Sequence, residues 1–310
     1  MLTRPGLVER WSHVVEDPSF PVRVTVHNLG VAPGGDGDHE SNATRLAEIR
    51  RDHAGDKLRF PGVKFVLDGS IQGWTAMMNW PGYYSGTDHG QLLTVPEQFV
   101  VWARPYHRAG IPIHIHCNGT ATIDLALDTV ERLVRAHPWL DHRHTIQHSQ
   151  LTTDAQLRRA KNLGMCVNIF ANHIWHWGDV HHEQTIGPER AKRLEPCGSA
   201  QRLGVPYSLH SDASVTPLGP LHLMWCAVNR LTPSGRVLGE HERISAFDAL
   251  WAVTQGAAYQ LHLDHLLGSI ECGKYADFTV LEQSPLDVDP MAIRDIGVWG
   301  TVLGGVPQPC

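Results

Sequence analysis

Histidines fall at the ends of short apolar runs in this sequence, where they could bind a metal ion. The chain of 310 residues contains 21 histidines. His114 and His116 stand two apart in IPIHIHCNG, so on a strand both would project to one face. His148 ends a similar run 32 residues after His116. Imidazoles brought together in this way are typical zinc ligands. The spacing therefore predicts a divalent metal site, with zinc as the expected ion.

A carboxylate and an amine extend this candidate site. Asp212 follows the run VPYSLHS, where a carboxylate could bind the metal and accept a proton from water. Lys64 lies inside the run VKFVLDGS, where packing gives no reason for an amine. A desolvated lysine can stay neutral and react with carbon dioxide to form a carbamate ligand. Each residue also has a simpler, structural explanation. The histidines could be hydrogen-bonded in the core, the lysine could be ion-paired, and the aspartate could cap a helix.

The runs that carry these residues are predicted strands, and predicted helices separate them. Strands are expected at 20–30, 63–70, 111–119, 143–150, 165–170 and 205–212. Helices are expected at 41–53, 96–109, 120–136, 153–163, 188–203, within 216–228 and at 245–260. The aromatic stretch 171–182 is expected to be a loop. Short strands are expected near the C-terminus, with VWGTVLGGV (298–306) as the last.

Six strand–helix units predict an α/β fold with a parallel sheet. No glycine-rich phosphate loop follows the first strand, which argues against a doubly wound nucleotide-binding fold. We therefore expect a TIM (β/α)8-type barrel that lacks its first strands, because a complete barrel needs eight units in roughly 250 residues. Active sites of such barrels lie at the carboxyl ends of the strands, where the candidate residues are expected.

Composition narrows the class of protein. The formal charge is −6, from 26 basic and 32 acidic residues. The sequence has no cluster of lysine and arginine, which argues against nucleic-acid binding. No apolar run is long enough for a membrane span, and the N-terminus has no signal-peptide core. Six cysteines lie far apart without a CxxC pair. We expect a cytoplasmic protein with reduced thiols, bound to neither membrane nor nucleic acid.

Five segments resemble successive motifs of the amidohydrolase superfamily, specifically the family 3 branch that includes N-substituted formamide deformylases. They are VKFVLDGSIQGWTA, IHIHCNGTATIDLALD, RHTIQHSQ, YSLHSDASV and GSIECGKYADFTVLEQSPLDV. The resemblance implies a metal-dependent hydrolase on a TIM barrel. It implies that the ligands are Lys64 of strand four, free or carboxylated, His116 of strand five, His148 of strand six and Asp212 of strand eight. It also implies a barrel portion over residues 1–265 and strands of a small β-sandwich over 266–310.

Two departures from the family pattern affect this interpretation. The family begins with a β-sandwich segment and a first barrel strand ending in His-x-His, and this chain starts after both. The strand-five motif usually ends in aspartate, where this chain has Thr120. We therefore expect the C-terminal portion of a longer enzyme, barely active alone. Its open sheet edges would need cover from another chain, as in a homodimer.

The expected reaction is hydrolysis of an amide-type, non-peptide C–N bond in a small molecule by a metal-activated water. Asp212 would take the proton from the water and return it to the leaving nitrogen. The residues expected to contact substrate are Asp68, His114, Asn118, Gln150, Trp175 and His210. Two alternatives remain at this point: an inactive truncated barrel with residual metal binding, and a phosphotriesterase-like activity on the same scaffold.

Overall fold

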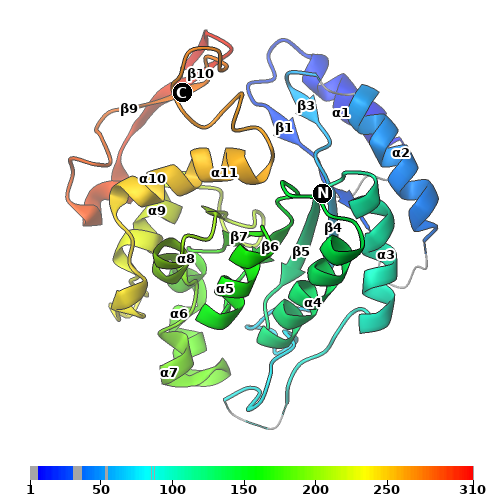
Figure 1. Ribbon diagram of the computed structural model, residues 1–310. Coiled ribbons are helices and arrows are strands. Elements are labelled where there is room, and N and C mark those ends of the chain that lie inside the picture. Colours follow the sequence, from blue (N-terminus) through cyan, green and yellow to red (C-terminus); the bar gives the residue numbers. More distant parts are fainter. Residues whose placement is uncertain (1–5, 31–36, 53–54, 85, 87, 310) are drawn as a thin grey trace.

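The computed structural model describes residues 6–30, 37–52, 55–84, 86 and 88–309, which form an α/β architecture (Figure 1). Its central sheet has six parallel strands in the order β2-β4-β5-β6-β7-β8. Their bounds are β2 (Asn28–Leu29), β4 (Val63–Val66), β5 (Ile113–Cys117), β6 (Thr145–His148), β7 (Cys166–Ile169) and β8 (Tyr207–Leu209). The predicted α/β class and parallel sheet are confirmed. Among the described residues, no pairing joins the edge strands β2 and β8.

Neighbouring strands of this sheet are aligned so that their polar residues come together. Lys64 pairs with His114, and His116 pairs with Gln147. The apolar residues between them, such as Phe65 and Ile115, are fully or almost fully buried. Near-continuous burial of this kind is typical of parallel strands covered on both faces. The carboxyl ends of β4, β5 and β6 therefore meet at one edge of the sheet.

Helices follow most of the strands, and α3, α4 and α5 lie side by side over one part of the sheet (Figure 1). The bounds before β8 are α1 (Leu7–Glu16), α2 (His39–Asp52), α3 (Pro96–Arg108), α4 (Thr120–Ala136), α5 (Asp154–Asn162), α6 (His173–Val180), α7 (Gly187–Ala191) and α8 (Cys197–Leu203). Those after β8 are α9 (Pro220–Asn229), α10 (Ala246–Val253) and α11 (Gln255–Gln260). Short helical turns are η1 (His181–Thr185), η2 (Glu240–Glu242) and η3 (Pro290–Asp295). Among the described residues, no helix is both long and apolar enough to cross a membrane.

Several sequence-based expectations are wrong in detail. The stretch 171–182 is helix α6 followed by the π-helical turn η1, not a loop. The expected helix 188–203 is divided into α7 and α8, because Pro196 cannot continue a helix and Glu195 has a φ of 50°. The expected helix 245–260 breaks at Thr254. Helix α1 has no counterpart among the predicted elements.

The first predicted strand, 20–30, is also divided. Its first part is β1 (Val24–Thr25), which pairs with β3 (Leu58–Arg59) in a separate two-stranded sheet, and only its second part, β2, joins the central sheet. Gly62 lies between β3 and β4. A Cβ atom on Gly62 would lie 2.5 Å from the carbonyl oxygen of Pro112, so the two backbones approach too closely for any other residue.

Short strands lie near the C-terminus, as expected, and they form a small antiparallel sheet. Its strands are β9 (Phe278–Leu281), β10 (Val298–Leu303) and β11 (Val306–Pro309), in the order β11-β10-β9. VWGTVLGGV is not the last strand, because the chain turns at Gly304 and Gly305, both with positive φ, and returns as β11. Two such residues suit the tight turn of a β-hairpin.

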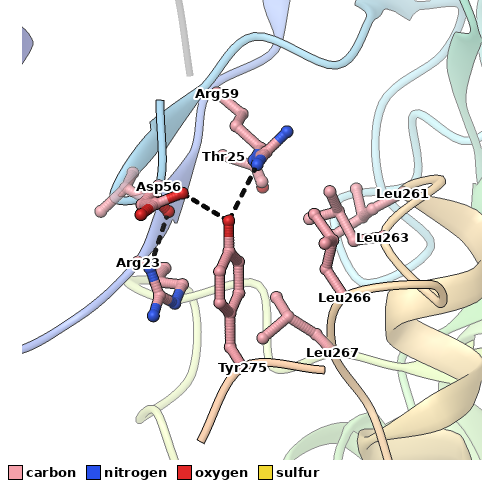
Figure 2. Close-up of a pocket in the computed structure, with 10 residues that line it drawn as sticks. Arg23, Thr25, Asp56, Arg59, Leu261, Leu263, Leu266, Leu267 and Tyr275 are labelled. Atoms are coloured by element: carbon pink, nitrogen blue, oxygen red, sulfur yellow. Dashed lines mark hydrogen bonds between the residues drawn. The ribbon is translucent and has the colours of Figure 1, made fainter. Parts of the chain in front are cut away.

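Residues 23–25 near the N-terminus and 261–275 near the C-terminus line a common cavity of about 150 Å³ (Figure 2). Arg23, just before β1, forms an ion pair with Asp277 at 2.5 Å, and its guanidinium lies 4.1 Å from the ring centre of Tyr275. The Tyr275 hydroxyl donates to the Asp56 carboxylate and lies 3.5 Å from the Arg59 guanidinium. These contacts fix the C-terminal segment against β1 and β3.

Helix α5 follows the loop that leaves the end of β6, and a capping box fixes its start. The Thr153 hydroxyl accepts from the Gln156 amide at 3.3 Å, and the Gln156 side chain accepts from the Thr153 amide at 3.0 Å. Thr153→Ala should lower the free energy of unfolding by about 1 kcal/mol, because the Gln156 amide at the helix start loses its acceptor. Urea unfolding measures this loss. Thr44→Ala is the control, since the Thr44 hydroxyl is exposed and donates to the Glu40 carbonyl oxygen of its own helix. Equal losses in both variants would contradict the capping argument.

Candidate metal centre

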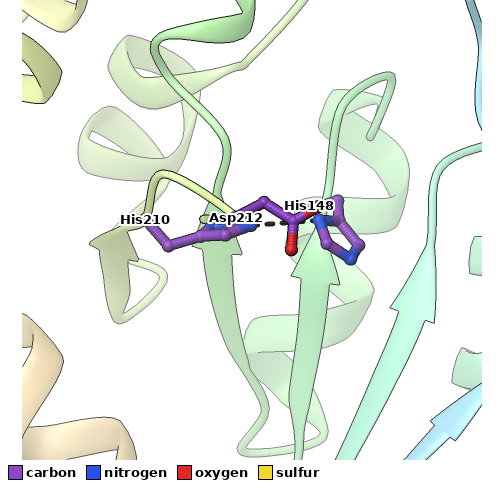
Figure 3. A group of neighbouring side chains, drawn as sticks. All are labelled: His148, His210 and Asp212. Carbon is purple, nitrogen blue, oxygen red and sulfur yellow. Dashed lines mark hydrogen bonds between the residues drawn. The ribbon is translucent and has the colours of Figure 1, made fainter. Parts of the chain in front are cut away.

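Side chains from the ends of three strands lie together at the carboxyl edge of the sheet. The His116 and His148 ring centres are 4.4 Å apart, and those of His148 and His210 are 4.9 Å apart. His148, His210 and Asp212 each offer a ligand atom within 4.8 Å of the others, and Figure 3 shows the Asp212 carboxylate between the two imidazoles. Lys64 lies near enough for its charge to act on Asp212. The strand alignment thus brings nitrogen and oxygen donors into one group.

A cavity of about 360 Å³ opens beside this group. Its lining residues are Gly69, Ser70, Gln72, Thr75, His116, Asn118, His148, Gln150, Phe170, His173, Asp212 and Val215. Five of these were singled out from the sequence: His116, Asn118, His148, Gln150 and Asp212. Phe170 and Val215 supply apolar surface, and Ser70 and Thr75 supply hydroxyls. The cavity therefore combines donors for a metal with walls suited to a small organic molecule.

Burial controls protonation in this group. Desolvation lowers the pKa of His116 to about 4 and that of His210 to about 3, and it lowers the pKa of His148 well below its usual value. The positive charge of Lys64 acts in the same direction on all three. Burial also lowers the pKa of Lys64 and raises that of Asp212, and each group's charge partly offsets the shift of the other. The imidazoles are therefore neutral at pH 7, the state that binds metal ions.

Two of the candidate ligands have an uncommon backbone conformation. His148 has a φ of 72°, the next residue Ser149 one of 54°, and Asp212 one of 50°. Residues other than glycine rarely adopt this left-handed region, and such conformations cluster at functional sites. The backbone at the ends of β6 and β8 is thus held in a costly conformation where both side chains turn toward the cavity.

Asp68 supports the site from behind. Its side chain is 0% exposed and accepts hydrogen bonds from the amides of Met77, Asn118 and Gly119 at 2.8–3.1 Å and from the Thr122 hydroxyl at 2.7 Å. Burial raises the pKa of Asp68 to about 6, against the opposing effect of these hydrogen bonds. The carboxylate ties the loop after β4 to the loop after β5. It does not line the cavity.

Three other residues singled out for substrate contact lie outside the cavity lining. His114 is buried in β5 and lies 2.7 Å, through Nδ1, from the Gln147 amide nitrogen. Trp175 packs edge-on against Trp225, 5.3 Å between ring centres, beneath the Arg294 guanidinium. His210 faces His148 rather than the cavity, with 3.0 Å between its Nε2 and His148 Nδ1.

His173 also lines the cavity, although it was not singled out from the sequence. Its Nδ1 atom lies 2.7 Å from Gln150 Nε2 and 3.2 Å from His181 Nε2. The carboxylate of Glu195, which is 0% exposed, lies 3.9 Å from the same atom. The available signal was the eight-residue interval between His173 and His181, which places both on one face of a helix.

Comparisons with known proteins extend this description. The sequence model of the Amidohydrolase family matches residues 3–308. Protein LONG AFTER FAR-RED 3 of Arabidopsis thaliana is 30% identical over 246 residues, covering 79% of this chain and 42% of that protein. An N-substituted formamide deformylase of Arthrobacter pascens is 31% identical over 199 residues, covering 64% of this chain and 36% of that protein. This chain thus spans less than half the length of either relative.

A solved structure shares the fold. It is that of an uncharacterized metal-dependent hydrolase from Pyrococcus horikoshii, with a TM-score of 0.76 and 22% sequence identity. The superposition covers 91% of this chain and 55% of the other. The parallel sheet and its helices therefore follow an architecture already known from a longer protein.

Proposed function

The chain belongs to the amidohydrolase family, and from this premise we propose that its cavity is the active site of a metal-dependent hydrolase. The proposed substrates are small molecules with an amide-type C–N bond. The relative named as an N-substituted formamide deformylase supports this bond class. The observation that carries the proposal is His148, whose Nε2 atom is buried and has no hydrogen-bond partner within the described part of the chain. A buried polar atom without a partner is costly, and a metal ion would satisfy it.

The donors present fit a zinc ion or a similar divalent cation. We assign Lys64, His116, His148 and Asp212 as the residues that would hold it. His116 Nε2 lies 3.0 Å from the carbonyl oxygen of Gly69 and 3.0 Å from the side-chain nitrogen of Asn118, and the ring nitrogen that keeps its lone pair would bind the ion. Imidazole nitrogen and carboxylate oxygen are common zinc ligands. When bound, such an ion polarises a carbonyl group and lowers the pKa of a water molecule.

The chain's own residues would then move the protons. Asp212 lines the cavity, and burial raises its carboxyl pKa, which makes it a better base than an exposed aspartate. We assign it to accept the proton of the attacking water and to deliver that proton to the leaving nitrogen. Phe170 and Val215 would contact the apolar part of the substrate. The volume of about 360 Å³ favours a substrate the size of a small amide.

The metal assignment is tested by composition. Protein purified without chelators should contain a bound divalent ion, and His148→Ala should lose most of it because a ligand is removed. Elemental analysis after gel filtration measures both. His265→Ala is the matched control, because His265 is exposed. If His148→Ala keeps the metal content of the parent, His148 is not a ligand and the proposed centre is wrong.

A further inference from the structure

A row of hydrogen-bonded side chains crosses the sheet beneath the proposed metal centre. Ser208 and His210 at the end of β8, Asn168 in β7, Gln147 in β6 and His114 in β5 form it. The strand alignment sets this order, because Gln147 pairs with Asn168 and Asn168 pairs with Ser208. None of these five residues is among the proposed ligands. His210 in turn contacts His148, which is one of the proposed ligands.

The Ser208 hydroxyl fixes the direction of these hydrogen bonds. Ser208 is 0% exposed, and its Oγ atom bonds Asn168 Oδ1 at 2.9 Å, the one side-chain hydrogen bond this hydroxyl makes among the described residues. A buried hydroxyl must donate its hydrogen or lose a hydrogen bond. The Asn168 atom that faces Ser208 is therefore the acceptor oxygen. Its amide nitrogen then donates to Gln147 Oε1 at 2.8 Å, which agrees with this orientation.

This orientation determines the tautomer of His210. His210 Nδ1 lies 3.2 Å from the same Asn168 oxygen. Because that oxygen can only accept, His210 Nδ1 carries the hydrogen and, in a neutral ring, Nε2 keeps the lone pair. His210 Nε2 therefore acts as an acceptor toward its neighbour.

The tautomer of His148 follows in turn. His148 Nδ1 lies 3.0 Å from His210 Nε2, so it must carry the hydrogen and donate it. The lone pair of His148 is then on Nε2, the buried atom that has no hydrogen-bond partner among the residues that the structure describes. Metal-binding histidines commonly donate their second ring nitrogen to a neighbouring group in this way.

We propose that Asn168 and His210 are positioning residues that hold His148 in the Nδ1–H tautomer, with its Nε2 lone pair directed to the metal. His210 acts through His148 and is not itself a ligand, although it lies within the group of three donors, because its Nε2 lone pair is taken by His148. This inference rests on the proposed function, because a directed Nε2 lone pair serves a role only where a metal ion binds. The tautomer itself is a property of the metal-free protein.

The tautomer is measured first, in the metal-free protein. Long-range proton–nitrogen NMR of protein with 15N-labelled histidine distinguishes the two neutral tautomers, and His148→Ala assigns the His148 signals. We expect the Nδ1–H form in the parent protein. A parent in which His148 is the Nε2–H tautomer would overturn the proposal. Because no metal is needed, this result is independent of whether the proposed function holds.

Variants of His210 supply the second measurement, with zinc as the probe and chelator competition as the assay. His210→Leu removes the acceptor and should weaken zinc binding about 10- to 100-fold. His210→Gln keeps a carbonyl oxygen that can accept from His148 and should stay within a few-fold of the parent. Equal weakening in both variants would overturn the positioning role. A parent that binds no zinc would overturn the proposed function and leave the NMR result to decide the tautomer.

Cobalt(II) spectra separate positioning from ligation. A ligand at position 210 would change the visible absorption bands of bound cobalt when His210 is replaced by glutamine, because one nitrogen donor is lost. We expect the bands of His210→Gln to match those of the parent. A change in band position and intensity comparable with that in His148→Ala would show that His210 is a ligand, and would overturn the proposal.

Discussion

Asparagine in place of Asp212 is expected to lower turnover about a thousandfold, because the amide cannot accept a proton from water or return it to the leaving nitrogen. The amide keeps one oxygen donor, so the loss of metal should be smaller than in His148→Ala. The measurement is turnover on a panel of N-formyl and N-acyl amines in excess zinc, with metal content and circular dichroism determined on the same samples.

The matched control for this variant is Asp128→Asn. Asp128 lies in α4, about half-exposed, and pairs with Arg159 at the surface, where loss of an ion pair costs little. It should keep parental turnover. More than a tenth of parental turnover in Asp212→Asn would exclude Asp212 as the proton carrier, provided that the variant is folded and holds metal.

Acidification is expected to unfold the metal-free protein between pH 6.5 and 4. Desolvation lowers the pKa of five histidines from 6.5 to about 3 or 4: His27, His116, His142, His181 and His210. Their pKa is lower in the folded state than in the unfolded chain, so the unfolded chain binds more protons in this interval. Their contribution to stability is present above pH 6.5 and is lost as the pH falls toward the folded-state values.

The summed contribution of these histidines is large enough to unfold the protein. Each unit of pKa difference corresponds to about 1.4 kcal/mol, so several such histidines together approach the total stability of about 5–15 kcal/mol that is usual for a protein. The carboxyls of Asp68, Glu195 and Asp212 act in the opposite direction, since burial raises the pKa of each, but they are fewer than the histidines. Urea unfolding of chelator-treated protein at pH 7.5, 6.0 and 5.0 measures the trend. A midpoint that does not change with pH would contradict the expected neutral burial of these histidines.

The sheet and its largest helix could be predicted from the sequence because their apolar patterns are strong. Helix α4 begins and ends where its pattern predicts, since its apolar residues stay on one face and are buried. The strand-end positions of His116, His148 and Asp212 followed from the same alternation of strands and helices. Parallel strands must deliver their carboxyl ends to one edge, so the grouping of these residues was accessible without coordinates.

Other elements depend on contacts that a local pattern does not contain. The buried face of α6 is formed by His173, Ile174 and Gly178 rather than by a stripe of large aliphatic residues. The break before α11 accompanies the close approach of Gly256 to β8, where a Cβ atom would lie 2.4 Å from the Tyr207 carbonyl oxygen. Trp175 was singled out by residue type, and the direction of its side chain, toward Trp225, is set by tertiary packing.

The contact between Arg23 and Asp277 determines when the fold can be completed during synthesis. The two residues are 254 positions apart, so at about 5–20 residues per second the ribosome adds the aspartate tens of seconds after the arginine. Strands β4, β5 and β6 pair with close neighbours in the chain and can associate earlier, because short loops close at a lower entropic cost. Until the ribosome has added the C-terminal segment, β1 and β3 are not packed against it and remain accessible to chaperones and proteases.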